Sequence, residues 1–517
     1  MIASAEAPTA FPACRPSRRS LLAGVGVSAA LAGVAQVARP TLAAAVTADP
    51  SLHLLRRATY GPTQSSVAAI KKQGTSAWLD AQLAPASISD SAMDDLLKRW
   101  PDLDLRTWEC REKYGQYGEN GGSGLAYQVL ESFVARALWS ERQLFEVTVG
   151  FWTNHLVVCV PNSEIWDSTH LFQRDVIRKY AFGRYLDMLT AAARHPAMLK
   201  TLDNADSGKL APNENYGREL LELHTVGIGN YTETDVKNSA LALSGLSIDN
   251  ENGLYEYKPQ RRYVGPLKVM GWSNTNNSPD NGANVALSYL SYLARHPKTA
   301  ARIATKLCVR FVSDTPPAAL VSRLAQVYLD NDTSVAPVLK ALFTSSEFAD
   351  AVGQKTKTPF EDTIATVRVL EAKPESKGTT ELRNLVYKLR AMGHAPMGWP
   401  APNGYPDVAA AWSGASTILA KWNFHLAMVG NWTLQGMPRL AAVTFVPQTL
   451  PTTYGALVDA FADRLLLPGL SASQRAALCK FVDKAPTDAL KSTDSILSYR
   501  LPYVLGLLLD SYNFAAR

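Results

Sequence analysis

A short acidic stretch in the middle of the chain, residues 213–225, carries the side chains best suited to chemistry. On a regular helix, Glu219 and Glu222 lie three positions apart and share one face. Two neighbouring carboxylates can divide the roles of acid and base, or bind one cation together with ligands from elsewhere. We therefore take Glu219 and Glu222 as candidate catalytic residues. The alternative is an exposed helix face on which Arg218 and Glu222 form an ion pair.

The same stretch lacks the spacing of the common metal sites. On a regular helix His224 lies about 200° around from Glu222, so Glu219, Glu222 and His224 cannot all bind one metal. Neither a Glu-x-x-His pair nor a His-Glu-x-x-His motif occurs here. The sequence does not identify a cofactor, and a divalent cation remains one of the candidates. It also leaves open whether four widely spaced cysteines are free or form one or two disulfides: Cys110, Cys159, Cys308 and Cys479.

Three other segments are suited to line a cleft beside the acidic stretch. Residues 151–155 combine an aromatic pair with Asn and His, 202–204 form a polar loop, and 402–407 form a rigid loop with Tyr and Asp. The alternatives are a core helix with an internally satisfied histidine, and loops that only cap the body. We expect five side chains to bind substrate: Trp152, Asn154, His155, Asn204 and Arg218. Arg218 would orient a carboxylate by a bidentate contact.

These residues favour an enzyme that acts on an extracellular polymer, and hydrolysis of a polysaccharide is the reaction that we rank first. Paired carboxylates suffice for glycoside hydrolysis without a cofactor. If two acids one turn apart are too close for that task, Asp203 or Asp407 is the candidate third acid. A metal- or cofactor-bearing oxidoreductase is the second alternative, and a non-enzymatic envelope or assembly protein is the third. The chain has no nucleophile elbow, P-loop or dinucleotide fingerprint in a strand–turn–helix context, which disfavours a serine hydrolase or an NTPase.

The elements that must position these residues are mainly helices. Residues 245–290, rich in Gly, Asn and Ser with short alternating pieces, predict a small β-hairpin or ordered loop excursion. Four prolines predict an irregular loop over 396–407. We expect a main helical domain over 46–370 and a C-terminal helical region over 381–517. Apolar residues recur at helical spacing in these segments: 125–156, 167–193, 213–225, 232–243, 299–311, 318–329, 335–344 and 416–434.

Residues 1–45 have the composition of an export signal. Arg18 and Arg19 precede a mild apolar run over 21–38, and small residues follow at 43–45, which resembles a twin-arginine signal. The alternative is an ordinary secretory signal. We therefore expect a secreted, periplasmic or envelope location without a stable membrane span after signal removal. Half of the net charge of +6 lies in this signal, and the rest of the chain carries only +3, which argues against a nucleic-acid partner and leaves a polymer or small-molecule substrate.

Taken together, the motifs resemble a bacterial family catalogued as domain of unknown function 1800. Their order and spacing agree with that family over about residues 50–430. The resemblance implies an exported, mostly helical protein, often with a twin-arginine signal, and it implies no settled activity. The matching segments are 54–61, 151–156, 213–227, 231–232, 235–236, 296–312, 343–348, 402–407 and 420–424.

Overall fold

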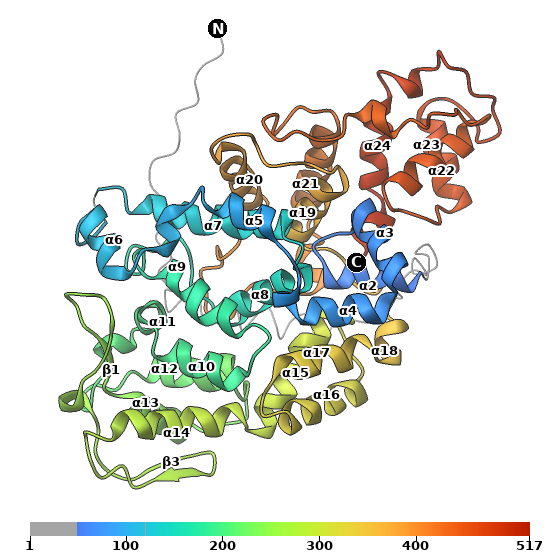
Figure 1. The fold of residues 1–517 in the computed structure, drawn as a ribbon. Coiled ribbons are helices and arrows are strands. Elements are labelled where there is room, and N and C mark those ends of the chain that lie inside the picture. Colours follow the sequence, from blue (N-terminus) through green and yellow to red (C-terminus); the bar gives the residue numbers. More distant parts are fainter. Residues whose placement is uncertain (1–48, 119) are drawn as a thin grey trace.

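The computed structural model describes residues 49–118 and 120–517, and it confirms the predicted mainly helical fold (Figure 1). The predicted signal over residues 1–45 lies outside the described residues. Within the described part, no helix combines the length and the apolar character needed to cross a bilayer. The first helices are α2 Pro50–Ala58, α3 Gln64–Gln73, α4 Thr75–Leu83, α5 Ser91–Leu97, α6 Thr107–Tyr114, α7 Ser123–Trp139 and α8 Gln143–His155, with short 3-10 turns η3 Pro85–Ser87 and η4 Pro101–Asp104.

The middle of the chain carries the candidate site and the strands. Its helical elements are α9 Thr169–Phe172, η5 Gln173–Arg178, α10 Tyr185–Ala193, α11 Pro196–Thr201, η6 Asn204–Asp206, α12 Glu214–Glu219, η7 Leu220–His224 and α13 Glu233–Leu243. Its strands are β1 Leu246–Ile248, β2 Tyr255–Tyr257, β3 Leu267–Val269 and β4 Trp272–Asn274, with η8 Pro259–Arg261 between them. The strands form two separate antiparallel hairpins, β1–β2 and β3–β4, in the excursion predicted at 245–290.

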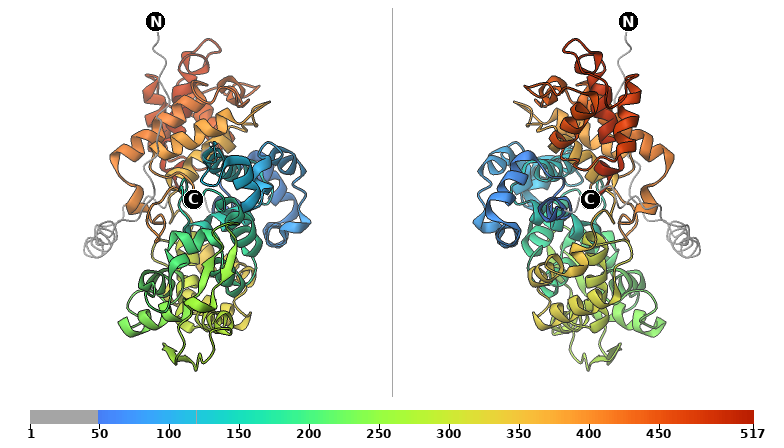
Figure 2. Two further views of the ribbon diagram at one scale, coloured as in Figure 1. Left: turned by 90° about the vertical axis from the view of Figure 1, so that its left-hand side faces the viewer. Right: turned by 90° about the vertical axis from the view of Figure 1, so that its right-hand side faces the viewer.

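The remaining elements are helical. They are α14 Gly282–Ala294, α15 Pro297–Phe311, α16 Ala318–Asp330, α17 Val335–Phe343, α18 Ser346–Ala349, α19 Pro359–Val369, α20 Thr380–Ala391, α21 Ala415–Val429, α22 Tyr454–Arg464, α23 Ala472–Phe481, α24 Leu501–Leu509 and α25 Tyr512–Ala515, with η9 Ala409–Trp412, η10 Ala442–Phe445 and η11 Ser495–Leu497. The views in Figures 1 and 2 agree that the hairpins and α22–α24 lie at opposite ends of the molecule. The predicted irregular loop at 396–407 is confirmed.

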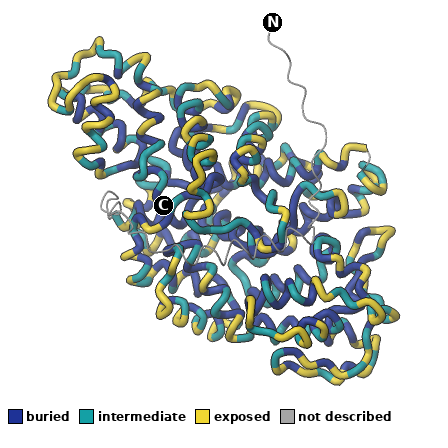
Figure 3. Tube along the Cα trace, turned by 180° about the vertical axis from the view of Figure 1, so that it is seen from behind, coloured by how far each residue is buried: buried dark blue, intermediate teal, exposed yellow. Residues whose placement is uncertain are grey.

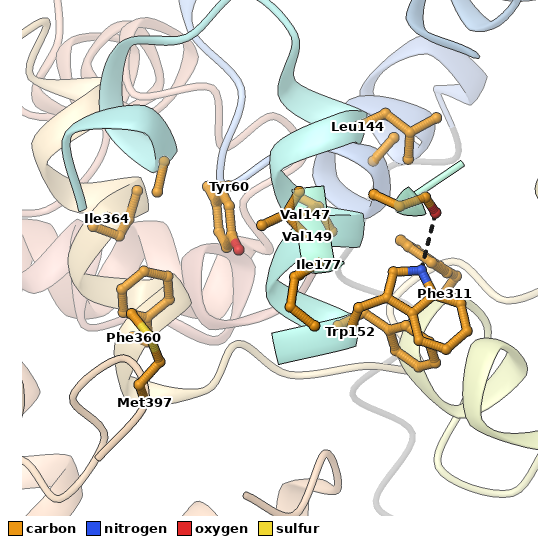
Figure 4. Packing of buried hydrophobic residues seen from close by; sticks show 14 of the residues in the cluster. Tyr60, Leu144, Val147, Val149, Trp152, Ile177, Phe311, Phe360, Ile364 and Met397 are labelled. Carbon is orange, nitrogen blue, oxygen red and sulfur yellow. Dashed lines mark hydrogen bonds between the residues drawn. The ribbon is translucent and has the colours of Figure 1, made fainter. Parts of the chain in front are cut away.

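One cluster of buried hydrophobic side chains runs through the body from Leu54 to Phe514, and a small second cluster surrounds Trp166. Figure 3 shows that buried residues occur along the chain from one end of the body to the other. Helix α19 lies at the centre of the larger cluster, since all of its residues are buried and it packs against α7 and α21. Figure 4 shows Phe360 and Ile364 of α19 in the same cluster as Tyr60. The core therefore continues across the boundary expected between 46–370 and 381–517, and that division stays a prediction.

Two helices predicted as continuous are interrupted, which corrects the sequence prediction. The 125–156 segment breaks after α7, because the Asp90 carboxylate accepts hydrogen bonds from the Ser140 hydroxyl and the Glu141 N–H. The 167–193 segment becomes α9, the π-helical η5 and α10. By contrast, the capped start of α13 is as predicted, because Thr232 and Asp235 form a capping box.

Candidate functional site

The acidic stretch changes helix type at Glu219. Asn213 caps α12 by accepting from the Tyr216 N–H at 3.1 Å, and the π-helix η7 follows from Leu220. The Thr225 hydroxyl donates to the Leu220 carbonyl at 2.6 Å, five positions back, which stabilises the wider turn. The predicted angle between Glu222 and His224 is that of a regular helix, so it does not hold in this π-helical segment. Single π turns occur often at functional sites.

Helix α12 lies unusually close to α13, and Gly217 makes that possible. A Cβ at Gly217 would lie 2.7 Å from the Val236 carbonyl oxygen and 2.8 Å from the Ala240 nitrogen. Position 217 therefore excludes any side chain larger than that of glycine. The close contact fixes where the next residues of α12 lie relative to α13. This contact sets the position of the carboxylate at Glu219.

Glu219 is buried, with 4% of its surface exposed. None of the described residues donates a hydrogen bond to its carboxylate. Burial, and then the neighbouring charge of Glu222, raises the pKa of Glu219 to about 7, although Arg218 opposes the shift. A carboxyl group in this state is partly protonated near neutral pH and can donate a proton.

Glu222 has a different environment. It stays partly exposed, and its carboxylate accepts a hydrogen bond from the Tyr231 hydroxyl at 2.6 Å. The pairing considered between Arg218 and Glu222 is wrong. Arg218 instead forms a bidentate pair with Glu233, at 2.9 and 2.6 Å, so both terminal guanidinium nitrogens are already bound. Glu222 is thus held by a neutral phenol rather than neutralised by a cation.

His155 belongs to a chain of hydrogen bonds that joins α8, α10 and α15. The Tyr185 hydroxyl donates its only hydrogen to the His224 carbonyl, at 2.5 Å. It must therefore accept from His155 Nε2–H, at 2.9 Å, which leaves Nδ1 of His155 without a hydrogen. Nδ1 accepts from Lys306 Nζ, also at 2.9 Å. The imidazole is neutral, because burial and then Lys306 hold the pKa of His155 well below its usual value.

Lys306 is itself a perturbed group. It is partly exposed, and burial, followed by the charge of Arg302, lowers the pKa of Lys306 to about 7. An amine with this pKa exchanges its proton readily at neutral pH, and its neutral form still donates a hydrogen bond to His155. Lys306 can therefore act as a proton acceptor whose hydrogen-bond partner is fixed.

The perturbed pKa of Lys306 gives a direct prediction. We expect acetic anhydride to label the Lys306 amine with a half-maximal rate near pH 7, because only the neutral amine reacts. Competitive labelling between pH 5 and pH 11, quantified by peptide mass spectrometry, measures this midpoint. Exposed Lys298 on the same helix serves as the internal reference. A midpoint above pH 10 for Lys306 would contradict the assignment.

Asn154 fastens the 402–407 loop to α8. Its side-chain N–H donates to the Tyr405 carbonyl at 2.8 Å, and its side-chain oxygen accepts from the Tyr405 N–H at 2.7 Å. Gly404 approaches so closely that a Cβ there would lie 2.2 Å from the Asn154 carbonyl oxygen. The side chain of Asn154, predicted to bind substrate, therefore has a positioning role.

Two other predicted substrate-binding residues lie in the interior. Trp152 is fully buried, stacks on Tyr185 and donates from Nε1 to the Ala181 carbonyl at 2.9 Å (Figure 4). Asn204 is also fully buried and donates to the Leu246 carbonyl at 3.1 Å. Neither offers a surface to a polymer. From the sequence alone, an aromatic side chain that lines a cleft cannot be distinguished from one that packs in the core.

The two candidates for a third acid also differ from expectation. Burial raises the pKa of Asp407, but Arg517, Lys355 and Arg310 outweigh it and hold that pKa far below its ordinary value. The Asp407 carboxylate is therefore ionised and cannot supply a proton. Asp203 is exposed in a left-handed turn, with φ of 56°.

The contribution of α15 to the site was not predicted from the sequence. Arg302, Lys306 and Arg310 follow one another at intervals of four residues and so lie on one side of the helix. Three cations in this arrangement repel each other. Their spacing in the sequence could therefore have indicated that they bind anionic groups elsewhere in the molecule. Arg310 binds Glu361 at 2.6 Å. Arg302 and Lys306 have no carboxylate within 4.0 Å among the described residues.

Metal ligands do not gather in the described part of the chain, where no group of three or more His, Cys, Asp or Glu side chains is placed to hold an ion. Cys110, Cys308 and Cys479 are free and buried, so no disulfide joins these three. A surface cavity of about 470 Å³ lies beside the segment that joins the two hairpins, where Lys209, Arg262 and Tyr263 are among its lining residues.

Comparison with known proteins identifies a family but no characterised relative. Residues 53–516 match the family model described as "Protein of unknown function (DUF1800)", which covers nearly all of the described residues. No curated protein matches the chain. No solved structure matches it either. The match confirms the resemblance drawn from the motifs, and the chain belongs to the DUF1800 family of proteins of unknown function.

Proposed function

We propose that this protein is an exported hydrolase that cleaves glycosidic bonds of an extracellular polysaccharide, with Glu219 as the general acid and Glu222 as its partner carboxylate. The observation that carries the proposal is the difference between the two environments. Glu219 is buried with a pKa raised to about 7 by burial and by Glu222, whereas Glu222 is partly exposed and bound to Tyr231.

Glycoside hydrolysis needs this division of labour. One carboxyl group must carry a proton for the leaving oxygen, and a second must be ionised to activate water or stabilise the developing positive charge. Neighbouring carboxylates acquire such roles when burial and like charge separate their protonation states. Export is supported by the signal predicted over residues 1–45, which lies outside the described residues.

The test is the release of reducing ends from purified polysaccharides, both neutral and acidic. We expect Glu219→Gln to lower the hydrolysis rate about 100-fold or more, because general acid catalysis contributes a factor of that order. Glu222→Gln should have a loss of similar size. Glu214→Gln is the matched control, since Glu214 is exposed in the first turn of the same helix.

Two outcomes would contradict the proposal. If both variants hydrolyse every polysaccharide at the unmodified rate, the glutamates are not catalytic. If instead Glu219→Ala melts at a much lower temperature without any loss of activity, the stretch is a helix-stabilising network, as expected for an envelope or assembly protein. A stoichiometric transition metal in the natively exported protein would favour the oxidoreductase alternative.

A further inference from the structure

Arg302 and the protonated form of Lys306 are two neighbouring cations that are accessible to solvent. They lie four residues apart on α15, and both are partly exposed. The Arg302 Nε–H donates to the Leu223 carbonyl at 3.2 Å, and Lys306 donates to His155 Nδ1. These contacts orient the two side chains, but they leave the positive charge of the pair without an anion in contact.

The arrangement around the pair is unfavourable for an isolated protein. Two like charges one helical turn apart destabilise a helix, and burial adds a further cost. On the same side of α15, Arg310 meets Glu361 and Asp407. Arg302 and Lys306 have no such partner, so a bound anion would relieve the repulsion between them.

The Leu223 carbonyl that Arg302 binds follows Glu222 directly in the chain, so the pair lies beside one of the two proposed catalytic glutamates. The charge of Glu222 acts on Arg302, and the charge of Asp407 acts on Lys306. Both acids lie beyond 4.0 Å from these cations, so neither occupies the place of a direct partner. They also add negative charge around it, which favours a singly charged anion over a doubly charged one.

We propose that Arg302 and Lys306 form a carboxylate-binding site that recognises the uronic acid units of an acidic polysaccharide. A planar guanidinium and an amine supply several donors to one carboxylate, and a guanidinium matches carboxylate geometry. His155 and Tyr185 are positioning residues, because their hydrogen bonds fix the direction of Lys306. The choice of polymer rests on the proposed function, whereas the binding of a carboxylate does not.

The first experiment needs no variant. We expect tri-galacturonic acid to protect the Lys306 amine from acetic anhydride at pH 8 by at least tenfold, while exposed Lys298 is labelled at an unchanged rate. Maltotriose, a neutral trisaccharide, should give no protection. Absence of protection by tri-galacturonic acid at millimolar concentration would overturn the proposal. Stronger protection by phosphate or sulfate would overturn the carboxylate assignment.

The second experiment uses variants on the same helix. Isothermal titration should show that Lys306→Met and Arg302→Met each bind tri-galacturonic acid at least tenfold more weakly, while Lys298→Met binds normally. Arg302→Lys, which keeps the charge, should restore part of the affinity. Equal affinity in all four proteins would overturn the proposal, and circular dichroism identifies any variant that fails to fold.

The outcomes separate this inference from the proposed function. Binding of tri-galacturonic acid without cleavage of any polysaccharide would support the carboxylate site and contradict the hydrolase. Cleavage of neutral polysaccharides with no binding of tri-galacturonic acid would support the hydrolase and contradict the site.

Discussion

Glu361→Gln is expected to destabilise the protein by about 3–5 kcal/mol, the usual cost of breaking a buried ion pair by removing one partner. The Glu361 carboxylate binds both Arg310, at 2.6 Å, and Arg517, and all three side chains are nearly inaccessible. The substitution leaves two buried arginines to share the charge of Asp407. The Gln side-chain oxygen can still accept from the Thr358 N–H, as Glu361 does at 2.9 Å, so the expected loss comes from the ion pairs and not from the helix cap.

The pH dependence gives this prediction a second readout. Burial raises the pKa of Glu361, but Arg310 and Arg517 outweigh burial and lower it to about 2. Because the folded-state pKa lies below the unfolded value, the stabilisation is complete above pH 4.5 and is lost as the pH falls from 4.5 to 2. Urea midpoints of the variant and the unmodified protein should therefore converge over this range.

Glu347 provides the control, because it forms an ion pair with Arg323 on an exposed face of the molecule. Glu347→Gln should leave the urea midpoint unchanged, as exposed pairs contribute little. If Glu361→Gln unfolds at the same urea concentration as the Glu347 variant, the buried network has no role in stability.

His425→Gln is the second substitution with a large expected effect. His425 lies between two carboxylates, with Nε2 at 2.7 Å from Asp362 and Nδ1 at 2.8 Å from Asp510. A ring with both nitrogens bound to carboxylates donates from each, so it is an imidazolium. Its removal leaves Asp362 buried, and among the described residues Lys421, at 3.0 Å, is then the one cation within 4.0 Å of its carboxylate. We expect a loss of about 3 kcal/mol near pH 6.

The loss should shrink as the pH rises. Burial lowers the pKa of His425, but Asp362 and Asp510 outweigh burial, so the folded-state pKa lies above 6.5. The stabilisation is therefore complete below pH 6.5 and disappears as the pH rises through the raised value. Melting temperatures measured from pH 6 to pH 9 should show the variant approaching the unmodified protein.

A second buried histidine serves as the control for this pH dependence. Burial, and then Arg57, lowers the pKa of His53 to about 4, so its ring is neutral throughout the range tested. His53 bonds the Phe348 carbonyl at 2.8 Å, and His53→Gln should cost the same at every pH from 6 to 9. A constant loss for His425→Gln would show that its ring is neutral as well.

The sequence predicted those parts of the fold that depend on local signals. Thr232 and Asp235 predicted the start of α13, the alternation around Tyr255 predicted a hairpin, and the prolines predicted the irregular loop at 396–407. Each of these features is decided within a few residues of the signal. The local sequence is therefore sufficient to predict the backbone where a helix cap, strand pairing across a tight turn or the missing N–H of proline determines it.

The candidate site was only partly predictable, because its contacts join distant segments. His155 and Lys306 are 151 positions apart, and nothing in either segment indicates the other. Periodicity predicts which face of a helix is buried, but not which side chain it meets. For this reason Trp152 was assigned to substrate and not to the core. Helix α15 brings together the segments at 151–155, 213–225 and 402–407. This helix was not among the elements predicted to form the site.

The π turn at η7 also constrains how this segment can evolve. A π turn accommodates more residues than an α turn between the same two ends, so Leu220–His224 holds surplus length. Loss of one residue there would let the segment close into a regular helix and would rotate everything after it. The His224 carbonyl would then leave the Tyr185 hydroxyl, and the orientation of His155 would be lost. Substitutions that keep the number of residues in this segment should therefore preserve the orientation of His155, whereas the deletion of a single residue should not.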